Sequence, residues 1–522
     1  MIGYAGQISL GHAGFLGIGA YSSAVLTTHF GFPPLLAMLT GAAAVALLAF
    51  LVARPILKLK GHYLAMATLG LGIIISIVIT NEAKYTGGPD GMSVPALTIL
   101  GWDVTGDATW YTLVAVLLIV ITWAAQNLID APAGRALQAI HGSEVAARVA
   151  GIDVAGAKVK IFVVSAILAS LMGSLTAHYV GFLTPGQAGF FHSIELMTMV
   201  VVGGMASVFG SIVGAALLTL LPQVLSAFEG WETVVFGAIL MATMISYQPV
   251  WYPRCDYVLP REGTNMLTVN HLSISFGGVK AVQDVSFSVG EGKVHAVIGP
   301  NGAGKTTMFN LISGVYIPSA GEILFRGENV ASMPPEQLAR RGMSRTFQNL
   351  QVCMNMSAIE NVMVGAHLKL NQSLFQAMCR LPGLRRRDAA CRQEAAGLMD
   401  FVGVGSYVDA HASQMPYGAL KRLEIARALA SSPSMLLLDE PAAGLNNTET
   451  REIEKLIRKI ADSGVTVLLV EHDMKLVTSI SDHILVMDHG SKLADGTPQE
   501  VCANPEVIAA YLGASVPAGV MQ

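Results

Sequence analysis

Charged residues are scarce in the first half of this 522-residue chain, and that scarcity limits how it can fold. Residues 1–250 hold 18 of the 68 Lys, Arg, Asp and Glu side chains. Apolar stretches of about 20 residues, the length that crosses a bilayer as a helix, recur in this half. We therefore predict a polytopic α-helical membrane domain over residues 1–250. The stretches fall near residues 8–28, 33–53, 62–81, 109–129, 159–181 and 231–249, with one longer stretch at 193–226.

Basic residues orient these stretches, because loops rich in Lys and Arg stay on the cytoplasmic side. They mark two loops, the first with Arg54, Lys58 and Lys60 and the second with Arg135, Arg148, Lys158 and Lys160. The acidic loop around Asp90 is then external. Residue 250 returns to the cytoplasm only if the stretch at 193–226 divides around Gly203-Gly204 and Gly210 into two short crossings. This orientation predicts about eight crossings.

The second half carries a glycine-rich phosphate loop. Residues 299–307 read Gly-Pro-Asn-Gly-Ala-Gly-Lys-Thr-Thr, between an apolar strand pattern at 295–298 and an apolar helical run at 308–312. The glycines let backbone N–H groups approach phosphate oxygens at the positive end of a helix. Lys305 supplies charge to the β- and γ-phosphates, and the Thr306 hydroxyl is placed to bind Mg²⁺. The pattern predicts an α/β P-loop NTPase domain that binds ATP and Mg²⁺. Its candidate ATP-binding residues are Gly299, Pro300, Asn301, Gly302, Ala303, Gly304, Lys305, Thr306 and Thr307.

Two further apolar runs end in acidic residues. The run at 435–438 ends at Asp439-Glu440, where Asp439 can hold Mg²⁺ and Glu440 can polarise the attacking water as a general base. The run at 465–470 ends at Glu471-His472-Asp473. His472 could touch the γ-phosphate, although a lone histidine is more often structural.

Composition sets the domain limits and excludes some partners. We place a linker at 251–264, the ATPase domain at 265–515 and a tail at 516–522, because prolines cluster where the charge density rises. The net charge of −4 indicates no nucleic-acid partner. None of the five cysteines forms a Cys-x-x-Cys pair, so a metal or disulfide framework is not expected.

Residues 266–515 resemble the ATP-binding subunit of ABC transporters. Gln348, in Ser-Arg-Thr-Phe-Gln-Asn-Leu, matches the family's Q-loop glutamine, which that resemblance places at Mg²⁺ and in catalysis. His472 matches the catalytic switch histidine, and Phe276 sits where the family stacks an aromatic ring on adenine. Two further motifs match by position: Tyr417 and Gly418 in the signature, which acts on a partner's ATP, and Asn446 in the D-loop.

The resemblance is closest to branched-chain amino acid importers. Residues 442–446 and the ending at 496–513 resemble their ATPases, and residues 1–247 resemble their permease. The loop at 134–158 is helix-prone and amphipathic, and Glu144, Ala147 and Gly151 resemble the coupling loop by which importer permeases dock on an ATPase. A surface helix lying on the membrane is the alternative for this loop. Two subunits that are often separate are thus expected in one chain.

The resemblance implies an ATP-driven importer for branched-chain or similar amino acids in a bacterial inner membrane, with the ATPase domain in the cytoplasm. It implies an external substrate-binding protein, a second permease subunit and a second ATPase. Urea or short amides are alternative substrates. An exporter half-transporter and a non-transporting nucleotide-binding regulator are alternative functions, although the short cytoplasmic loops argue against the exporter.

The sequence departs from the family pattern at the signature, which reads Met-Pro-Tyr-Gly-Ala. Pro416 and Ala419 replace a serine and a glutamine, and a helix is expected to start near Leu420. The missing serine hydroxyl predicts a slow ATP site and a hetero-complex in which a partner ATPase has an intact signature. The permease-like string also begins at residue 2, where relatives have sequence upstream, which suggests either a truncated permease or a miscalled start codon.

Overall fold

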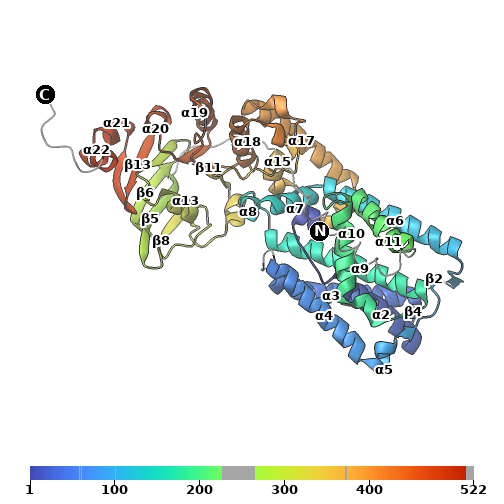
Figure 1. The fold of residues 1–522 in the computed structure, drawn as a ribbon. Coiled ribbons are helices and arrows are strands. Elements are labelled where there is room, and N and C mark those ends of the chain that lie inside the picture. Colours follow the sequence, from blue (N-terminus) through green and yellow to red (C-terminus); the bar gives the residue numbers. More distant parts are fainter. Residues whose placement is uncertain (58, 60–61, 100, 226–264, 371–372, 513–522) are drawn as a thin grey trace, which may run out of the picture. The chain divides into compact units, whose positions relative to one another are not determined.

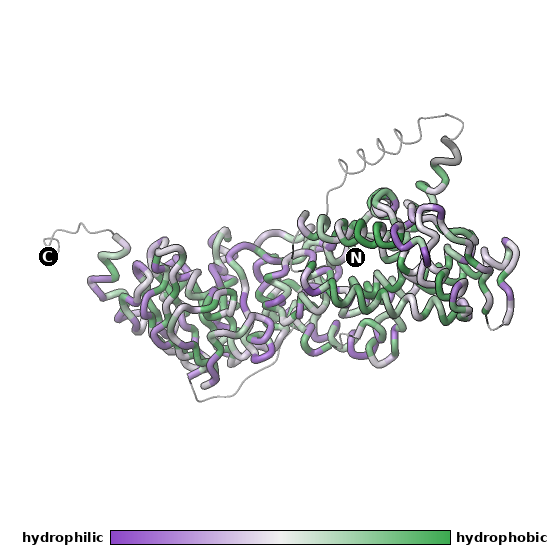
Figure 2. Tube along the Cα trace, turned by 90° about the horizontal axis from the view of Figure 1, so that it is seen from below, coloured by the Kyte–Doolittle hydropathy of each residue, from purple (hydrophilic) through white to green (hydrophobic). Residues whose placement is uncertain are grey.

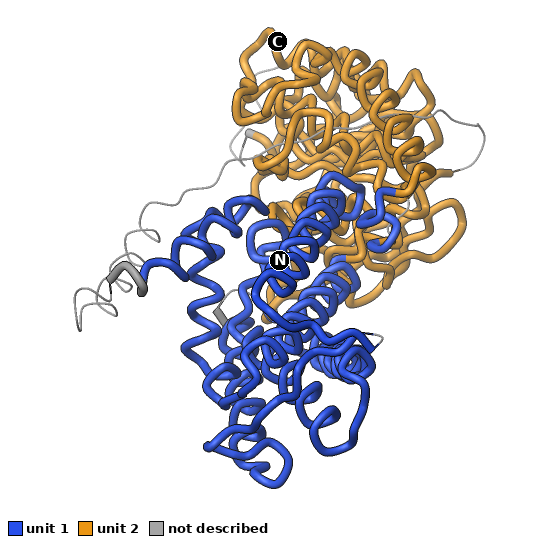
Figure 3. The backbone as a smooth tube through the Cα atoms, turned by 90° about the vertical axis from the view of Figure 1, so that its right-hand side faces the viewer, with its two compact units in different colours: residues 1–137, 154–249, 374–380 blue, residues 138–153, 250–373, 381–522 orange. Residues whose placement is uncertain are grey.

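The computed structural model describes residues 1–57, 59, 62–99, 101–225, 265–370 and 373–512 (Figure 1). The chain divides into two compact units (Figure 3). The first contains residues 1–137, 154–249 and 374–380, and the second contains residues 138–153, 250–373 and 381–522. The predicted crossing at 231–249, the linker at 251–264 and the tail at 516–522 lie outside the described residues.

The first unit is a bundle of apolar helices, which Figure 2 shows as mostly hydrophobic traces. Among the described residues, four helices are long and apolar enough to cross a membrane, namely α3, α4, α6 and α9. The helices of this unit are α1 (Ile2–Ala5), α2 (His12–Phe30), α3 (Pro34–Ile56), α4 (His62–Asn81), α5 (Ala83–Thr86), α6 (Asp107–Asp130), the start of α7 (Pro132–Gly142), α9 (Val154–Val180), α10 (Phe190–Gly203), α11 (Val208–Leu225) and α16 (Leu374–Met378). The longer helices α2, α3, α4, α6 and α9 match predicted apolar stretches closely, because a segment in lipid must satisfy its backbone within a helix.

Helix α2 lies at the centre of this bundle and packs against α3, α4 and α9. Small residues allow the close approach of α2 and α9: a Cβ on Gly19 would lie 2.1 Å from the carbonyl oxygen of Ser170, and one on Gly173 would lie 2.0 Å from that of Leu16. Helices in membranes associate through such small-residue contacts, since lipid supplies no hydrophobic drive between them. The dense glycines of the N-terminal region therefore include residues that serve close packing.

Short strands join two loops at one end of the bundle. Strand β1 (Met92–Ser93) pairs antiparallel with β4 (Phe182–Leu183), and β2 (Thr98–Ile99) pairs with β3 (Trp102–Asp103). Two 3₁₀ turns, η1 (Gly88–Asp90) and η2 (Pro185–Ala188), lie in the same loops. The predicted external loop after α4 and the one after α9 thus lie together, as an orientation with both on one side of the membrane requires.

The long apolar stretch is broken as the sequence predicted. Helix α10 ends at Gly203, Gly204 has φ 100°, and α11 begins at Val208. The two helices pack against each other, and a Cβ on Gly203 would lie 1.9 Å from the carbonyl oxygen of Gly210. The 14 residues of α10 span about 21 Å, less than the hydrocarbon core of about 30 Å. The break is confirmed, whereas the number of crossings stays a prediction.

The second unit contains a sheet buried on both faces. Its strand order is β10-β11-β12-β7-β13-β14, parallel except at β14. Continuous apolar strands such as β7, β11 and β12 are typical of a parallel sheet covered on both sides. The strands are β7 (Val294–Ile298), β10 (Met343–Arg345), β11 (Met435–Asp439), β12 (Thr466–Val470), β13 (His483–Asp488) and β14 (Ser491–Gly496).

A second sheet, with order β6-β5-β8-β9, lies in the same unit, and its apolar side chains share one core with helix α13. Its strands are β5 (Asn265–Phe276), β6 (Val279–Gly290), β8 (Ala320–Phe325) and β9 (Glu328–Asn329). The helices of the unit are α7 (Pro132–Gly142, in part), α8 (Glu144–Val149), α13 (Lys305–Ile312), α14 (Pro335–Arg340), α15 (Ala358–Gly365), α17 (Pro382–Phe401), α18 (Tyr417–Leu429), α19 (Asn447–Asp462), α20 (Met474–Ile480), α21 (Pro498–Ala503) and α22 (Pro505–Leu512). Short 3₁₀ turns are η3 (His367–Lys369), η4 (Gly405–Tyr407) and η5 (Ala412–Gln414).

Candidate functional site

The phosphate loop joins the buried strand β7 to helix α13. Gly304, which has φ 92°, occupies the position before the helix. A side chain there would be strained at that φ, and its Cβ would lie 2.4 Å from the carbonyl oxygen of Ala281. Only glycine therefore lets the loop turn into the helix and leave its first N–H groups free for an anion. Asn301 and Thr306 are exposed along this loop, and Ala303 is buried.

Lys305 is the buried cation of the loop. Its Nζ donates hydrogen bonds to the carbonyl oxygens of Gly299 at 2.7 Å and Pro300 at 3.0 Å. Burial lowers the pKa of Lys305, and the nearby Glu440 and Asp439 carboxylates oppose that shift. The ammonium group thus lies between the loop and the two acids at the end of β11, where the phosphates of a nucleotide would need it.

Asp439 ends strand β11 and is 2% exposed. Its Oδ2 accepts a hydrogen bond of 2.8 Å from the buried guanidinium of Arg345, which also donates to Asn310 and Ser313. Its Oδ1 is buried and has no hydrogen-bond partner among the described residues. Burial raises the pKa of Asp439, and Arg345 opposes the shift. A buried carboxylate oxygen with no partner fits a hard cation such as Mg²⁺.

Glu440 and Gln348 are brought together from distant parts of the chain. The Gln348 Nε2 donates to the Glu440 Oε2 at 3.0 Å. Glu440 has φ 47°, an uncommon backbone conformation for a residue other than glycine. Its N–H donates to the carbonyl oxygen of Val470. Lys421 on α18 is buried, and its Nζ donates to the backbone oxygens of Gln348 and Glu440. The position of the candidate base is thus fixed by three segments at once.

His472 follows β12 with its side chain 63% exposed. Its neighbour Glu471 is buried, accepts hydrogen bonds from the N–H groups of Ala442 and His472, and has a pKa raised by burial. Glu471 therefore ties the loop after β12 to the loop after β11. Phe276 is 45% exposed and makes an edge contact with Tyr316, 5.4 Å between ring centroids, which leaves a ring face for stacking.

The signature differs from the prediction in its helix start. Helix α18 begins at Tyr417 with Pro416 before it, and the predicted start near Leu420 is wrong. A proline suits this position because it needs no N–H before the first turn. Gly418 lies against Glu449, whose Oε1 would be 2.3 Å from an added Cβ. A larger residue at position 418 would therefore collide with the Glu449 side chain. The first N–H groups of α18 remain available at its positive end.

Asn446 caps helix α19. Its Oδ1 accepts from the N–H groups of Thr448 and Glu449, and the Glu449 carboxylate accepts from the Asn446 N–H, which is a capping box. The side chain of Tyr417 lies beside Gly444, with a ring carbon 3.2 Å from an added Cβ on that glycine. The signature and the D-loop therefore form one surface.

The middle of the predicted coupling loop at 134–158 belongs to the second unit, since residues 138–153 group with the ATPase fold. Ser143 caps α8, which packs against α14. Ala147 is 1% exposed, and Glu144 lies in the first turn of α8. Gly151 has φ 85°, and an added Cβ would lie 2.6 Å from the side chain of Leu368. These contacts favour the docking helix over a helix lying on the membrane surface.

Four charged residues of the site were not singled out from the sequence: Arg345, Lys421, Glu424 and Glu471. Each is almost fully buried. Glu424 accepts from the N–H groups of Phe347 and Gln351, which follow Arg345, and burial raises its pKa. The one available signal was a charge inside an apolar strand or helix, because a buried charge needs a partner. The partners themselves lie up to 94 residues away, as for Arg345 and Asp439.

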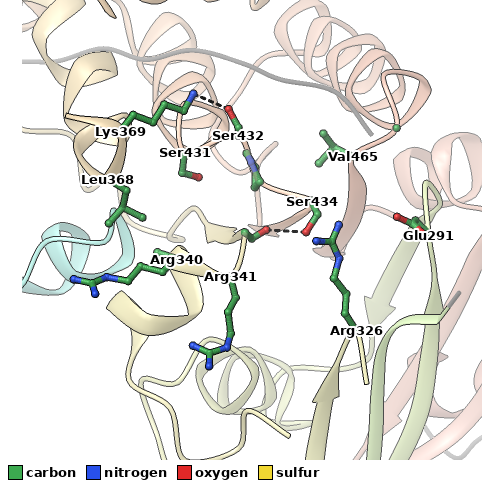
Figure 4. A pocket seen from close by; sticks show the side chains of 14 residues that line it. Glu291, Arg326, Arg340, Arg341, Leu368, Lys369, Ser431, Ser432, Ser434 and Val465 are labelled. Atoms are coloured by element: carbon green, nitrogen blue, oxygen red, sulfur yellow. Dashed lines mark hydrogen bonds between the residues drawn. The ribbon is translucent and has the colours of Figure 1, made fainter. Parts of the chain in front are cut away.

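A separate cavity of about 640 Å³ lies in the second unit (Figure 4), and none of the residues that line it belongs to the phosphate loop. Figure 4 shows Lys369 bonded to Ser432 on one side and Arg326 on the other. Its wall includes Leu368, which lies against Gly151, and Arg340 of α14. The cavity therefore borders the elements that hold α8 and is distinct from the candidate nucleotide site.

Comparisons with known proteins divide the chain in the same way. Residues 1–246 match the family described as branched-chain amino acid transport system, permease component. Residues 282–443 match the ABC transporter family, and residues 491–517 match the branched-chain amino acid ATP-binding cassette transporter family. The first half and the second half thus match two components of one kind of system.

Curated ATP-binding relatives cover about half of this chain. The chain is 45% identical over 249 residues to the high-affinity branched-chain amino acid transport ATP-binding protein BraF of Pseudomonas aeruginosa, covering 48% of this chain and 98% of the relative. It is 43% identical to LivG of Escherichia coli K12 with the same coverage, and 33% identical to a probable LivG of Archaeoglobus fulgidus, covering 96% of that relative. The chain therefore belongs to the branched-chain amino acid ABC transporter family and joins a permease component to an ATP-binding component in one polypeptide.

Proposed function

We propose that this chain is an ATP-driven importer component for branched-chain or similar amino acids, delivered by an external binding protein. The observation that carries the proposal is the segment at 138–153. It lies in the sequence between α6 and α9 of the helical bundle, but it packs within the ATPase unit. Such a segment can transmit a movement of the ATPase to the helices on either side of it. We place the protein in a bacterial inner membrane with its ATPase domain in the cytoplasm.

The chain's own residues account for hydrolysis. Asp439 and Thr306, with Gln348 beside them, would hold Mg²⁺, which when bound would neutralise charge that develops on the phosphates. Lys305 and the free N–H groups of α13 would bind the phosphates, and Phe276 would stack on the adenine. Glu440 would accept a proton from the attacking water, held in place by Gln348, Lys421 and the Val470 carbonyl. His472 would reach the γ-phosphate from its exposed loop.

The direct test is reconstitution in proteoliposomes with a candidate binding protein and radiolabelled leucine. Uptake that requires ATP on the ATPase side and the binding protein on the other supports the proposal. Uptake of urea or short amides with no uptake of leucine would favour the alternative substrates. Outward movement would indicate an exporter, and nucleotide binding without any transport would indicate a regulator.

We expect Gly151→Ala to uncouple hydrolysis from transport. The added Cβ meets the Leu368 side chain in a backbone conformation that other residues rarely adopt. Strain of this kind costs about 1–3 kcal/mol, so docking of α8 should weaken by about five- to hundredfold. Uptake per ATP hydrolysed, measured in proteoliposomes, should fall while nucleotide affinity is unchanged. Val145→Ala, an exposed position on the same helix, is the control and should keep coupling.

We also propose that the chain works with a second permease and a second ATPase in a hetero-complex. Pro416 is exposed before α18 and has neither a hydroxyl nor an N–H to offer a partner's ATP. Loss of one donor to a charged group costs about 1.5–3 kcal/mol, which predicts one slow site. A partner ATPase with a serine at this position would supply the fast site.

Pro416→Ser should raise hydrolysis in the reconstituted complex, by about tenfold or more if the new hydroxyl reaches the phosphate. Ala419→Gln is left out of the first test, because Ala419 is 2% exposed and a longer side chain at a buried position has to displace its neighbours. Pro416→Ala removes the ring without adding a donor and should not raise the rate. Equal stimulation by both variants, or brisk transport by a homodimer that Pro416→Ser leaves unchanged, contradicts the unequal-site proposal.

A further inference from the structure

A short segment near the middle of the ATPase sequence belongs to the membrane unit. Residues 374–380 group with the helical bundle, and α16 (Leu374–Met378) packs against α6. Asn127, in the last turns of α6, is 4% exposed, and its Nδ2 donates to the carbonyl oxygen of Met378 at 3.0 Å. This bond accounts for a buried amide near the end of an apolar helix, because the amide satisfies the end of α16.

In the proposed orientation of the membrane domain, the contact lies at the level of the lipid headgroups. Asn127 comes 20 residues after the first residue of α6, which corresponds to about 30 Å of helix and to the thickness of the hydrocarbon core. The chain after α6 enters residues 138–153, which belong to the ATPase unit. The end of α6 that carries α16 is therefore the ATPase side of the membrane.

The two sides of α16 differ. Ala377 is 2% exposed, whereas Phe375 is 72% exposed. Two residues along a helix turn the side chain by about 200°, so Phe375 points away from the side on which Ala377 is buried. An exposed phenylalanine at the headgroup level is typical of a segment that enters the membrane interface.

Along the sequence, the charged residues from 361 to 387 have one sign. Residues 361–387 contain five Lys or Arg and no Asp or Glu. They are Lys369, Arg380, Arg385, Arg386 and Arg387. Arg380 is exposed and has no ion pair in the part of the chain that the structure describes. Basic residues near a cytoplasmic leaflet are attracted by anionic phospholipids.

We propose that residues 374–380 form a binding site for anionic phospholipid at the cytoplasmic surface of the bilayer. The Phe375 ring enters the upper acyl region, and Arg380 pairs with a headgroup phosphate. The site rests on the proposed orientation of the membrane domain. It binds the lipid beside α6, at a place other than the coupling loop.

The depth of Phe375 can be measured in the full chain, reconstituted with its partner subunits into nanodiscs. A fluorescent amino acid is introduced at position 375, and the nanodiscs contain lipids brominated on the upper acyl chain. We expect strong quenching at position 375. The same probe at Ile317, an ATPase residue that is 69% exposed, should not be quenched. No quenching at 375, or a probe emission that changes only when the second permease is omitted, would show that protein covers this face and overturn the proposal.

The headgroup preference is tested separately by ATP hydrolysis in nanodiscs of phosphatidylcholine with increasing phosphatidylglycerol. Arg380→Gln should shift the half-maximal response to a higher phosphatidylglycerol fraction, by up to about fivefold. Arg451→Gln, which removes an exposed charge from α19, should not shift it. Equal curves for Arg380→Gln and the parent, or a response to soluble glycerophosphate in neutral nanodiscs, would overturn the lipid assignment. Quenching at 375 without any amino acid uptake would instead refute the proposed substrate and leave the lipid site standing.

Discussion

Glu440→Gln is expected to abolish steady-state ATP hydrolysis while ATP binding is preserved. The substitution keeps the size of the side chain and removes its ability to accept a proton. Gln348 already donates to the Glu440 Oε2 at 3.0 Å, and an amide oxygen at the same place can still accept that bond. Loss of a general base costs about 10²–10⁴ in rate. Phosphate release and nucleotide affinity are measured on the same reconstituted protein.

The matched control is Glu394→Gln, which removes an exposed carboxylate from α17 and should leave the rate unchanged. Thermal unfolding of both variants should match that of the parent. If Glu440→Gln releases phosphate at close to the parent rate, Glu440 is not the base, and the buried Glu471 next to His472 becomes the residue to test.

Sequence patterns went furthest where one local rule decides the structure. Helix α4 was predicted at 62–81 and spans His62–Asn81, because a segment in lipid must satisfy its own backbone. The strand before the phosphate loop was predicted at 295–298 and is Val294–Ile298, because the loop motif demands it. The break at Gly204 followed from counting sides of the membrane. None of these predictions needed knowledge of distant contacts.

Local reasoning failed where a tertiary contact decides. The start of α18 was expected near Leu420, but the helix begins at Tyr417, directly after Pro416, because proline is well tolerated just before a helix. The bond from Arg345 to Asp439 links residues on adjacent strands that are far apart in sequence. A pattern marks such residues only as charges in apolar surroundings and cannot name their partners.

Two segments that each group with the other compact unit, residues 138–153 and 374–380, show the same limit of local reasoning. Residues 138–153 were predicted to dock on an ATPase from their likeness to a coupling loop, and they pack within the ATPase unit. The complementary segment at 374–380 follows no motif, and α16 has only five residues. Its place on α6 depends on one buried amide, Asn127, and on the burial of Ala377. Only the folded chain brings these residues together.

Lys305→Ala is expected to weaken nucleotide binding and end transport. Lys305 is the only Lys, Arg or His within the loop at 299–307, so no neighbour there can replace its charge. Its ammonium also bonds the carbonyl oxygens of Gly299 and Pro300, which hold the loop in shape. A hydrogen bond to a charged group is worth about 1.5–3 kcal/mol, so affinity should fall by about ten- to hundredfold. A binding titration with a fluorescent ATP analogue measures this directly.

Loss of affinity has two possible causes, and a second variant separates them. Lys305→Met keeps the length of the side chain and its packing along the loop, but removes the charge and all three donors. If the charge binds the phosphates, both variants lose ATP affinity to a similar degree. The control variant Lys293→Ala, at an exposed position just before strand β7, should lose none. If only the packing of the Lys305 side-chain carbons along the loop matters, Lys305→Ala unfolds at a lower temperature and Lys305→Met retains most of its affinity for ATP. Unchanged affinity in both variants would remove Lys305 from the site, and the N–H groups at the start of α13 would then be the main phosphate ligands.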